Sequence, residues 1–194
     1  IQKRNIYFCS QNLMKLHPQF DDIIGKILKK DKKAKILFIK DRYEILSKKI
    51  IERFKNNQSI DIDKITFLDK MNVEDYINLC GSSSVLLDTL YFGAGNSFHE
   101  SMFYGTPTVS MPTKNLKSRI VLGAYKQMQI EKPPIVSSLE EYVDKSVELA
   151  NEEPSKILDL KKYFQKQADK FLFENKKFID EINHIFEELY KKKD

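Results

Sequence analysis

Short apolar runs alternate along this chain with longer amphipathic stretches, and this alternation limits the fold more than any other feature. The short runs are continuous in Val, Ile, Leu and aromatic residues, which is typical of strands that are buried on both faces. They lie at residues 6–9, 36–39, 65–68, 85–87, 108–110 and 135–136. The stretches between them predict helices at residues 18–30, 43–55, 73–80, 97–104, 116–128 and 137–151. Strands separated by helices predict a Rossmann-like α/β fold, with a doubly wound parallel sheet covered on both faces.

The chain has the organisation of one domain followed by helices. Its 194 residues contain no repeat at a fixed period and no linker rich in Pro, Gly or Ser. We predict a sheet-containing part over residues 1–153. Residues 154–194 are predicted as two helices that break near Phe173 and pack on this domain or on a part of the protein outside this chain. Since Ile1–Arg4 include neither an initiator Met nor a signal-like apolar region, we expect a fragment of a longer protein.

The composition excludes several classes of function. The chain has 33 Lys and Arg against 28 Asp and Glu, and its basic clusters at 29–35 and 191–193 lack interleaved aromatic residues, which argues against nucleic acid binding. No apolar run approaches the length of a membrane span. The small positive excess is compatible with a ligand that carries phosphate.

The cysteines and histidines indicate no metal site. Cys9 and Cys80 each lie in an apolar segment and predict buried, reduced thiols of a cytoplasmic protein. The three histidines do not cluster with cysteines or carboxylates at metal-ligand spacing. The pair Asp61 and Asp63 formally matches the Asp-x-Asp of metal-dependent sugar transferases. It precedes a predicted strand, away from the ligand edge of the sheet, and we interpret it as a loop.

The loop after the fourth predicted strand has the features of a phosphate site. Ligands of open α/β sheets bind beyond the carboxyl ends of the strands. Gly93 and Gly95 permit close approach of a backbone, and Asn96 or Ser97 can cap the next helix, whose free amides would hold a pyrophosphate. Glu100, predicted in the first turn of that helix, is placed to reach a ribose diol. The same residues also fit an ordinary capped turn, and spacing alone leaves both interpretations open.

Two further loops at the same predicted edge carry candidate residues. Lys15 stands among apolar neighbours after the first strand, where an ammonium would neutralise a departing diphosphate; the alternative is an exposed surface lysine. Tyr76 lies in the helix after the third strand and would stack on a base; the alternative is core packing.

Taken together, these loops resemble glycosyltransferase family 41, the O-linked N-acetylglucosamine transferases with SPINDLY-type proteins and bacterial homologues. The matching stretches are residues 9–18, 65–76, 85–89, 93–100, 105–112 and 116–120, and the resemblance covers about residues 5 to 150. It implies a GT-B fold, two Rossmann-like domains of which this chain would be the C-terminal one, holding a UDP-sugar donor. It also implies that no divalent metal or cofactor is required.

The resemblance assigns roles to individual positions. Lys15 matches the lysine that contacts the donor phosphates and supports departure of the leaving group, and it is the one catalytic candidate. Asn96 and Ser97 match the pair that binds the diphosphate, and Glu100 matches the acidic residue that holds the ribose. Tyr76 falls where the animal enzyme has a His that stacks on uracil, so the swap keeps an aromatic ring.

Three other positions complete the predicted donor site. Asn12 lies three residues before Lys15, where family members have Gln or Ser, and Met71 lies in the loop before Tyr76. Gly95 replaces a His beside the diphosphate in the animal enzyme, and Val73 replaces a family Lys near the base. Because both replacements remove polar contacts with the donor, sugar preference does not carry over.

The resemblance implies inverting transfer of a sugar, N-acetylglucosamine or a hexose, from UDP to a Ser or Thr of a protein acceptor. The proposed bases and acceptor contacts of the family lie in an N-terminal half that this chain lacks, so we expect the fragment alone to be inactive. Two alternatives stay open: a UDP-sugar epimerase of GT-B type, and a non-catalytic module that binds UDP-sugars or docks partners.

Overall fold

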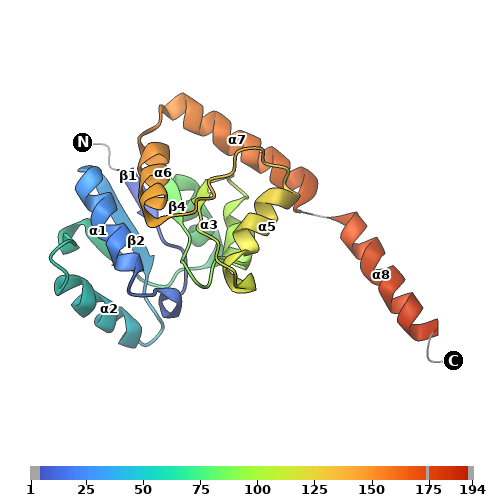
Figure 1. Cartoon of the computed structure of the whole chain (residues 1–194), viewed down its shortest axis with the longest axis horizontal. Helices are drawn as coiled ribbons and strands as arrows, with labels where there is room; N and C mark the ends of the chain where they lie inside the picture. Colours follow the sequence, from blue (N-terminus) through green and yellow to red (C-terminus); the bar gives the residue numbers. More distant parts are fainter. Residues whose placement is uncertain (1–4, 174, 192–194) are drawn as a thin grey trace.

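Five parallel strands form the centre of the structure (Figure 1), a computed structural model that describes residues 5–173 and 175–191. The strands are β1 (Asn5–Phe8), β2 (Ala34–Ile39), β3 (Ile65–Leu68), β4 (Val85–Leu87) and β5 (Thr108–Val109). Their order in the sheet is β3-β2-β1-β4-β5. The predicted doubly wound parallel sheet is confirmed. Residues 1–4, on which the expectation of a fragment rested, lie outside the described residues. Lys192 and Lys193 of the predicted basic cluster also lie outside them.

Helices cover both faces of the sheet, as the continuous apolar runs predict. On one face lie α1 (Phe20–Lys30), α2 (Ile45–Lys55) and α6 (Leu139–Asn151); on the other lies α3 (Val73–Ser82). Side chains alternate along a strand, so Tyr7 and Cys9 join the α1–α6 core whereas Phe8 joins the α3 core. A third core lies beside the sheet and unites α4 (Asn96–Ser101), α5 (Ile120–Gln127) and α7 (Pro154–Phe171).

Ser137, Ser138 and Glu141 form a cap at the start of α6. The Ser138 hydroxyl accepts a hydrogen bond from the Glu141 amide at 3.1 Å, and the Glu141 carboxylate accepts one from the Ser137 amide at 2.8 Å. One free amide of the first turn and the amide of Ser137, just before the N-cap residue, are thereby satisfied, which stabilises the turn into α6.

Three predicted elements differ from those observed. The helix predicted at 116–128 is divided into a 3-10 turn, Leu116–Ser118, and α5, because the Ser118 hydroxyl bonds back to Thr113 and Asn115 and closes the turn. The helix predicted at 97–104 ends as α4 at Ser101, and residues 103–105 continue only as tight turns that close on Gly105. The strand predicted at 135–136 is a single bridge between Ser110 and Ile135.

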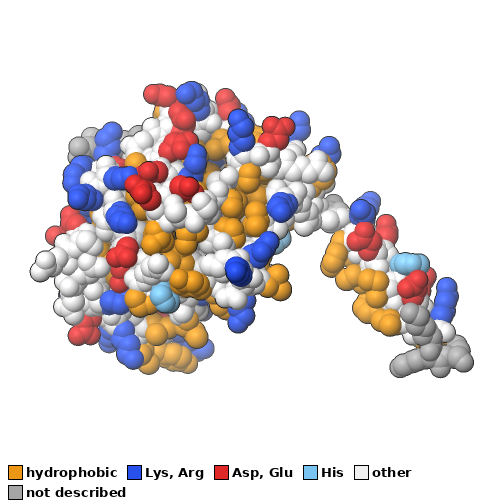
Figure 2. Space-filling model, viewed as in Figure 1, with side chains coloured by type: hydrophobic (Ala, Val, Ile, Leu, Met, Phe, Trp, Pro, Cys, Tyr) orange, Lys and Arg blue, Asp and Glu red, His pale blue; other side chains and the backbone are white. Residues whose placement is uncertain are grey.

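The two closing helices differ from each other. In α7, Phe164 and Ala168 are buried in the third core. In α8 (Lys176–Lys191) none of the described residues is buried, and the helix extends away from the rest of the chain (Figure 1). Its apolar side chains, among them Phe178, Ile185 and Phe186, gather along one side (Figure 2). None of the described helices combines the length and apolar character that crossing a membrane requires.

Candidate functional site

The loops after β1 and β4 border the point where the strand order reverses. From β1 the chain builds outward to β2 and β3, and it then returns to place β4 and β5 on the other side of β1. The loops leaving β1 and β4 therefore diverge, and the crevice between them is the usual ligand position in an open α/β sheet. The predicted residues Lys15 and Ser97 come from these two loops.

Lys15 is held at this crevice by both loops. It ends the short 3-10 helix Leu13–Lys15, and its Nζ donates to Gln11 Oε1 at 2.9 Å and to the Gly93 carbonyl at 3.0 Å. The ammonium also lies 4.3 Å from the centroid of the Phe92 ring, a cation–π contact. Partial burial lowers the pKa of Lys15, and the nearby carboxylate of Asp88 opposes this shift. The ammonium is therefore ordered and partly desolvated, which strengthens its interaction with an anion.

The start of α4 offers free backbone amides beside Lys15. The first hydrogen bond of the helix runs from the Phe98 amide to the Gly95 carbonyl at 2.9 Å, so the amides of Asn96 and Ser97 precede the helical ladder. A Cβ placed on Gly95 would meet no described atom within 4 Å, and the surface above it is open. A ligand phosphate has room to approach these amides.

The two glycines of this loop serve different purposes. A Cβ placed on Gly93 would lie 2.8 Å from Asp88 Oδ2, too close for any real side chain, whereas Gly95 has free space. Gly93 is thus required for the loop to fold over Asp88, and Gly95 opens onto the crevice. The sequence interpretation assigned both glycines to ligand approach, and for Gly93 the structure supplies this structural reason instead.

Asp88 is a buried carboxylate beneath the loop that sequence reasoning missed. It is 1% exposed and accepts hydrogen bonds from the Ala94 amide at 2.7 Å and from the Ser110 hydroxyl at 2.6 Å. Burial raises its pKa to about 6, and these hydrogen bonds limit the rise. A carboxylate directly after a fully apolar strand was the signal that would have found it.

Four predicted donor residues line one hollow, which we call the Tyr76 hollow. Met71, Tyr76, Ser97 and Glu100 border this space of about 290 Å³, together with Ser10 and Lys70. An aromatic wall, a carboxylate and a lysine around a small hollow suit a polar ring system with hydroxyl groups. Glu100 is the fifth residue of α4 and lies beyond the first turn, contrary to prediction, because the helix begins at Asn96.

Tyr76 packs in the core and also borders the Tyr76 hollow. Its ring borders the Tyr76 hollow and also packs edge-on against Phe8, with centroids 6.1 Å apart. The hydroxyl is buried and has no hydrogen-bond partner of good geometry among the described residues. Burial raises the pKa of Tyr76, so the group stays protonated.

Lys15 itself borders a second hollow, which we call the Lys15 hollow. It measures about 580 Å³ and is bordered by Met14, Lys15, His17, Tyr91 and Phe92, among others. Most of this border is apolar or aromatic. The two hollows flank the residues that connect Lys15 with Ser97.

The remaining predicted residues lie at the edge of the site. Asn12 is exposed, and its Oδ1 accepts a hydrogen bond from the Met14 amide at 2.9 Å, which caps the helix that ends at Lys15. Asn96 is exposed at the start of α4. Gln11, between these elements, was not predicted; its position in the loop after β1 was the only sequence signal.

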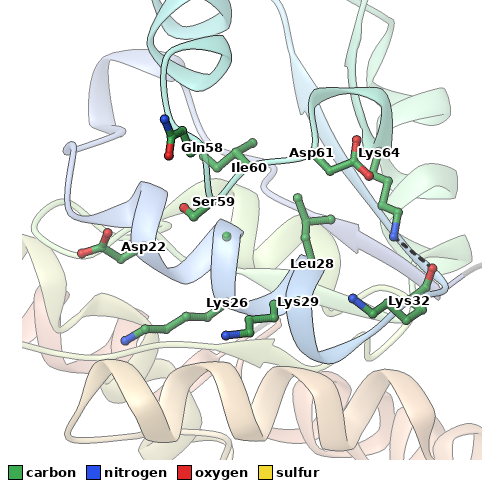
Figure 3. Close-up of a pocket in the computed structure, with 11 residues that line it drawn as sticks. Asp22, Lys26, Leu28, Lys29, Lys32, Gln58, Ser59, Ile60, Asp61 and Lys64 are labelled. Carbon is green, nitrogen blue, oxygen red and sulfur yellow. Dashed lines mark hydrogen bonds between the residues drawn. The ribbon is translucent and has the colours of Figure 1, made fainter.

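The Asp61 and Asp63 pair lies away from this site, as predicted. The two residues belong to a turn before β3, where Asp61 caps Asp63, and so lie at the amino ends of the strands. Asp61 borders a hollow of about 600 Å³ between α1 and residues 58–64 (Figure 3). Lysines surround this hollow but do not converge: Lys64 donates to the Lys32 carbonyl, and Lys26 points away from Ser59 (Figure 3). Among the described residues, no three His, Cys, Asp or Glu side chains are grouped to hold a metal ion.

Comparison with known sequences identifies relatives of one kind. The sequence profile described as Glycosyl transferase family 41 matches residues 1–182. A probable UDP-N-acetylglucosamine–peptide N-acetylglucosaminyltransferase of Arabidopsis thaliana is 24% identical over 149 residues, which are 77% of this chain and 15% of that protein. The UDP-N-acetylglucosamine–peptide N-acetylglucosaminyltransferase of Caenorhabditis elegans is 23% identical over 189 residues, 96% of this chain and 16% of that protein. The chain therefore spans about one sixth of the length of these relatives.

Solved structures show the same fold. A mutant O-GlcNAc transferase of Thermobaculum terrenum superposes with a TM-score of 0.83 at 16% identity, covering 97% of this chain and 36% of that one. An α,α-trehalose 6-phosphate synthase of Burkholderia multivorans gives a TM-score of 0.64 at 8% identity, covering 98% of this chain and 44% of that one. The predicted GT-B domain fold is confirmed by these matches.

Proposed function

This chain belongs to glycosyl transferase family 41, and we propose that it is the donor-binding domain of an enzyme that transfers a sugar from UDP to a protein Ser or Thr with inversion. The names of its relatives, which are peptide N-acetylglucosaminyltransferases, support this class of reaction. The observation that carries the proposal is the position of Lys15, held between the β1 and β4 loops beside the open amides of α4.

The geometry of the crevice suits a UDP-sugar lying across it. The uridine would occupy the Tyr76 hollow, with its base against Tyr76 and Met71 and its ribose diol donating to the Glu100 carboxylate. The diphosphate would lie between Lys15 and the Asn96 and Ser97 amides, where positive charge and free N–H groups face an anion. The sugar would then point toward the Lys15 hollow, which has aromatic walls.

The residues of this chain act on the leaving group in the proposed reaction. When the bond between the sugar and the phosphate oxygen breaks, negative charge accumulates on the UDP β-phosphate. The Lys15 ammonium and the α4 amides are already ordered and stabilise that charge without reorganisation. The acceptor hydroxyl and the group that takes its proton would come from the rest of the full-length protein, so this chain alone is proposed to bind donor without transferring it.

Binding of UDP to the 194-residue chain tests this proposal. We expect calorimetric titration to detect binding of UDP to the chain. Lys15→Ala should weaken the affinity for UDP about ten- to hundredfold, since one charge-assisted hydrogen bond to phosphate is lost. Lys29→Ala, a lysine at the opposite edge of the sheet, is the matched control and should bind UDP like the parent. If the parent shows no affinity for UDP, or if Lys15→Ala binds it equally well, the proposed donor site is wrong.

A further inference from the structure

The side chain of Gln11 joins Lys15, which borders the Lys15 hollow, to Ser97, which borders the Tyr76 hollow. It is 4% exposed, its Oε1 accepts a hydrogen bond from Lys15 Nζ at 2.9 Å, and its Nε2 donates to Ser97 Oγ at 2.8 Å. We infer that Gln11 is a positioning residue that directs two hydrogen-bond donors, the Lys15 ammonium and the Ser97 hydroxyl, toward the donor diphosphate. This inference rests on the proposed function.

The orientation of the Gln11 amide follows from its partners. A lysine ammonium can only donate, so the amide oxygen must face Lys15 and the amide nitrogen must face Ser97. A second contact, from Nε2 to Ser10 Oγ at 3.3 Å, uses the other hydrogen of the same nitrogen. Both ends of the amide are therefore engaged. The flipped orientation is excluded because it would place the amide NH₂ group against the Lys15 ammonium, and both groups can only donate.

This orientation decides what Ser97 presents to a ligand. A serine hydroxyl has one hydrogen and two lone pairs. Because Gln11 donates to the Ser97 oxygen, the hydroxyl hydrogen is not needed for this contact and is available to a phosphate oxygen. Ser97 also borders the Tyr76 hollow, at the point where the diphosphate would leave the nucleoside.

The same amide decides what Lys15 presents. Gln11 Oε1 and the Gly93 carbonyl accept two of the three hydrogens of the ammonium, which leaves the third for a ligand. Both of these acceptors are neutral. The ammonium therefore keeps its full charge for the diphosphate while its direction is held.

A glutamate at position 11 would reverse both effects without changing the shape of the side chain. Its carboxylate would form an ion pair with Lys15 and neutralise the charge offered to phosphate. It would also accept a hydrogen bond from the Ser97 hydroxyl, since a carboxylate has no hydrogen to donate, and so turn that hydroxyl away from the ligand. A residue with a purely structural role at this position would not separate phosphate binding from nucleoside binding.

The test compares UDP with uridine on the full 194-residue chain. We expect Gln11→Glu to bind UDP at least tenfold more weakly than the parent and uridine equally well, with an unchanged urea midpoint. Gln58→Glu adds the same charge at an exposed position at the opposite edge of the sheet, and should leave the affinity for both ligands unchanged. Gln11→Leu, which keeps Lys15 charged, should lose less UDP affinity than Gln11→Glu.

The possible results separate the inference from the proposed function. Equal UDP affinity of Gln11→Glu and the parent, with a loss in Lys15→Ala, overturns the role of Gln11 and leaves the donor site standing. Equal losses for UDP and uridine also overturn it, because they indicate general damage to the site. Absence of UDP binding by the parent overturns both. If Gln11→Glu does not fold, Gln11→Leu decides: a loss confined to UDP supports the inference, and unchanged UDP binding overturns it.

Discussion

Asp88 shows at the scale of one residue how the loop over the crevice is anchored. Its buried carboxylate holds the Ala94 amide on one side and the Ser110 hydroxyl on the other, so the loop is tied to the strand region beside it. The cost is electrostatic, because burial raises the pKa of this carboxyl from 3.8 to about 6. A folded-state pKa above the unfolded value means that the folded protein binds this proton more tightly than the unfolded chain does.

We predict that substitution of Asp88 changes how the stability of the protein depends on pH. The contribution of Asp88 is fully present below pH 4 and is lost as the pH rises through about 6, which amounts to roughly 3 kcal/mol at most. Asp88→Asn lacks this titration. We therefore expect the free energy of unfolding of the parent, relative to that of Asp88→Asn, to fall between pH 4 and pH 7 in urea titrations. If the free energies of unfolding of the parent and of Asp88→Asn change with pH in parallel, the raised pKa of Asp88 is wrong.

At the scale of the element, α7 is attached to the α3–α4 region by polar and steric fit as well as by its apolar face. Lys161 Nζ donates to the Gly81 and Ser83 carbonyls, both at 2.8 Å, and Gln165 donates to the Phe103 carbonyl at 2.8 Å. Gly105 lies directly beneath α7 with φ +61°, and a Cβ there would overlap the Lys161 carbonyl. The turn that ends α4 and the docking of α7 therefore depend on the same glycine.

Gly105→Ala is expected to lower the free energy of unfolding by about 3 kcal/mol or more, because it adds both backbone strain and a clash with α7. The control is Gly123→Ala in α5, where a Cβ meets no described atom within 4 Å. That change should instead raise stability by about 0.5–1 kcal/mol through helix propensity. Urea unfolding of both variants is the measurement, and the element-scale account fails if the two substitutions have similar effects.

At the scale of the whole molecule, the chain divides energetically before α8. The three cores take their buried residues from elements up to α7, whereas all the described residues of α8 are at least partly exposed. Burial of apolar surface is the dominant stabilising contribution. We infer that the remainder of the chain folds without α8.

Truncation tests this division. Removal of residues 175–194 should leave the free energy of unfolding within about 0.5 kcal/mol of the parent, since none of the described residues of α8 is buried. Removal of residues 154–194 takes Phe164 and Ala168 from the third core, and loss of one buried Phe alone costs about 3–5 kcal/mol. Comparable losses of stability in the two truncations, measured by urea unfolding, would show that α8 contributes to the fold.

Sequence periodicity determined the elements of this protein and the edge of the sheet where a ligand would lie. Strand β3 was predicted with its observed bounds, 65–68, because the period of side-chain burial is a local property of the chain. The parallel arrangement then brought the loops of Lys15 and Ser97 to one edge, since all carboxyl ends of parallel strands share it.

Tertiary structure alone decided where elements stop and how the site residues act on one another. The end of α4 depends on α7 packing over Gly105, and the role of Gln11 depends on Ser97, 86 positions away in the sequence. Asp88 acts as an anchor only because the fold excludes water around it. Spacing along a chain carries information over a few residues, whereas hydrogen-bond partners and burial at these positions are set by segments that meet only after folding.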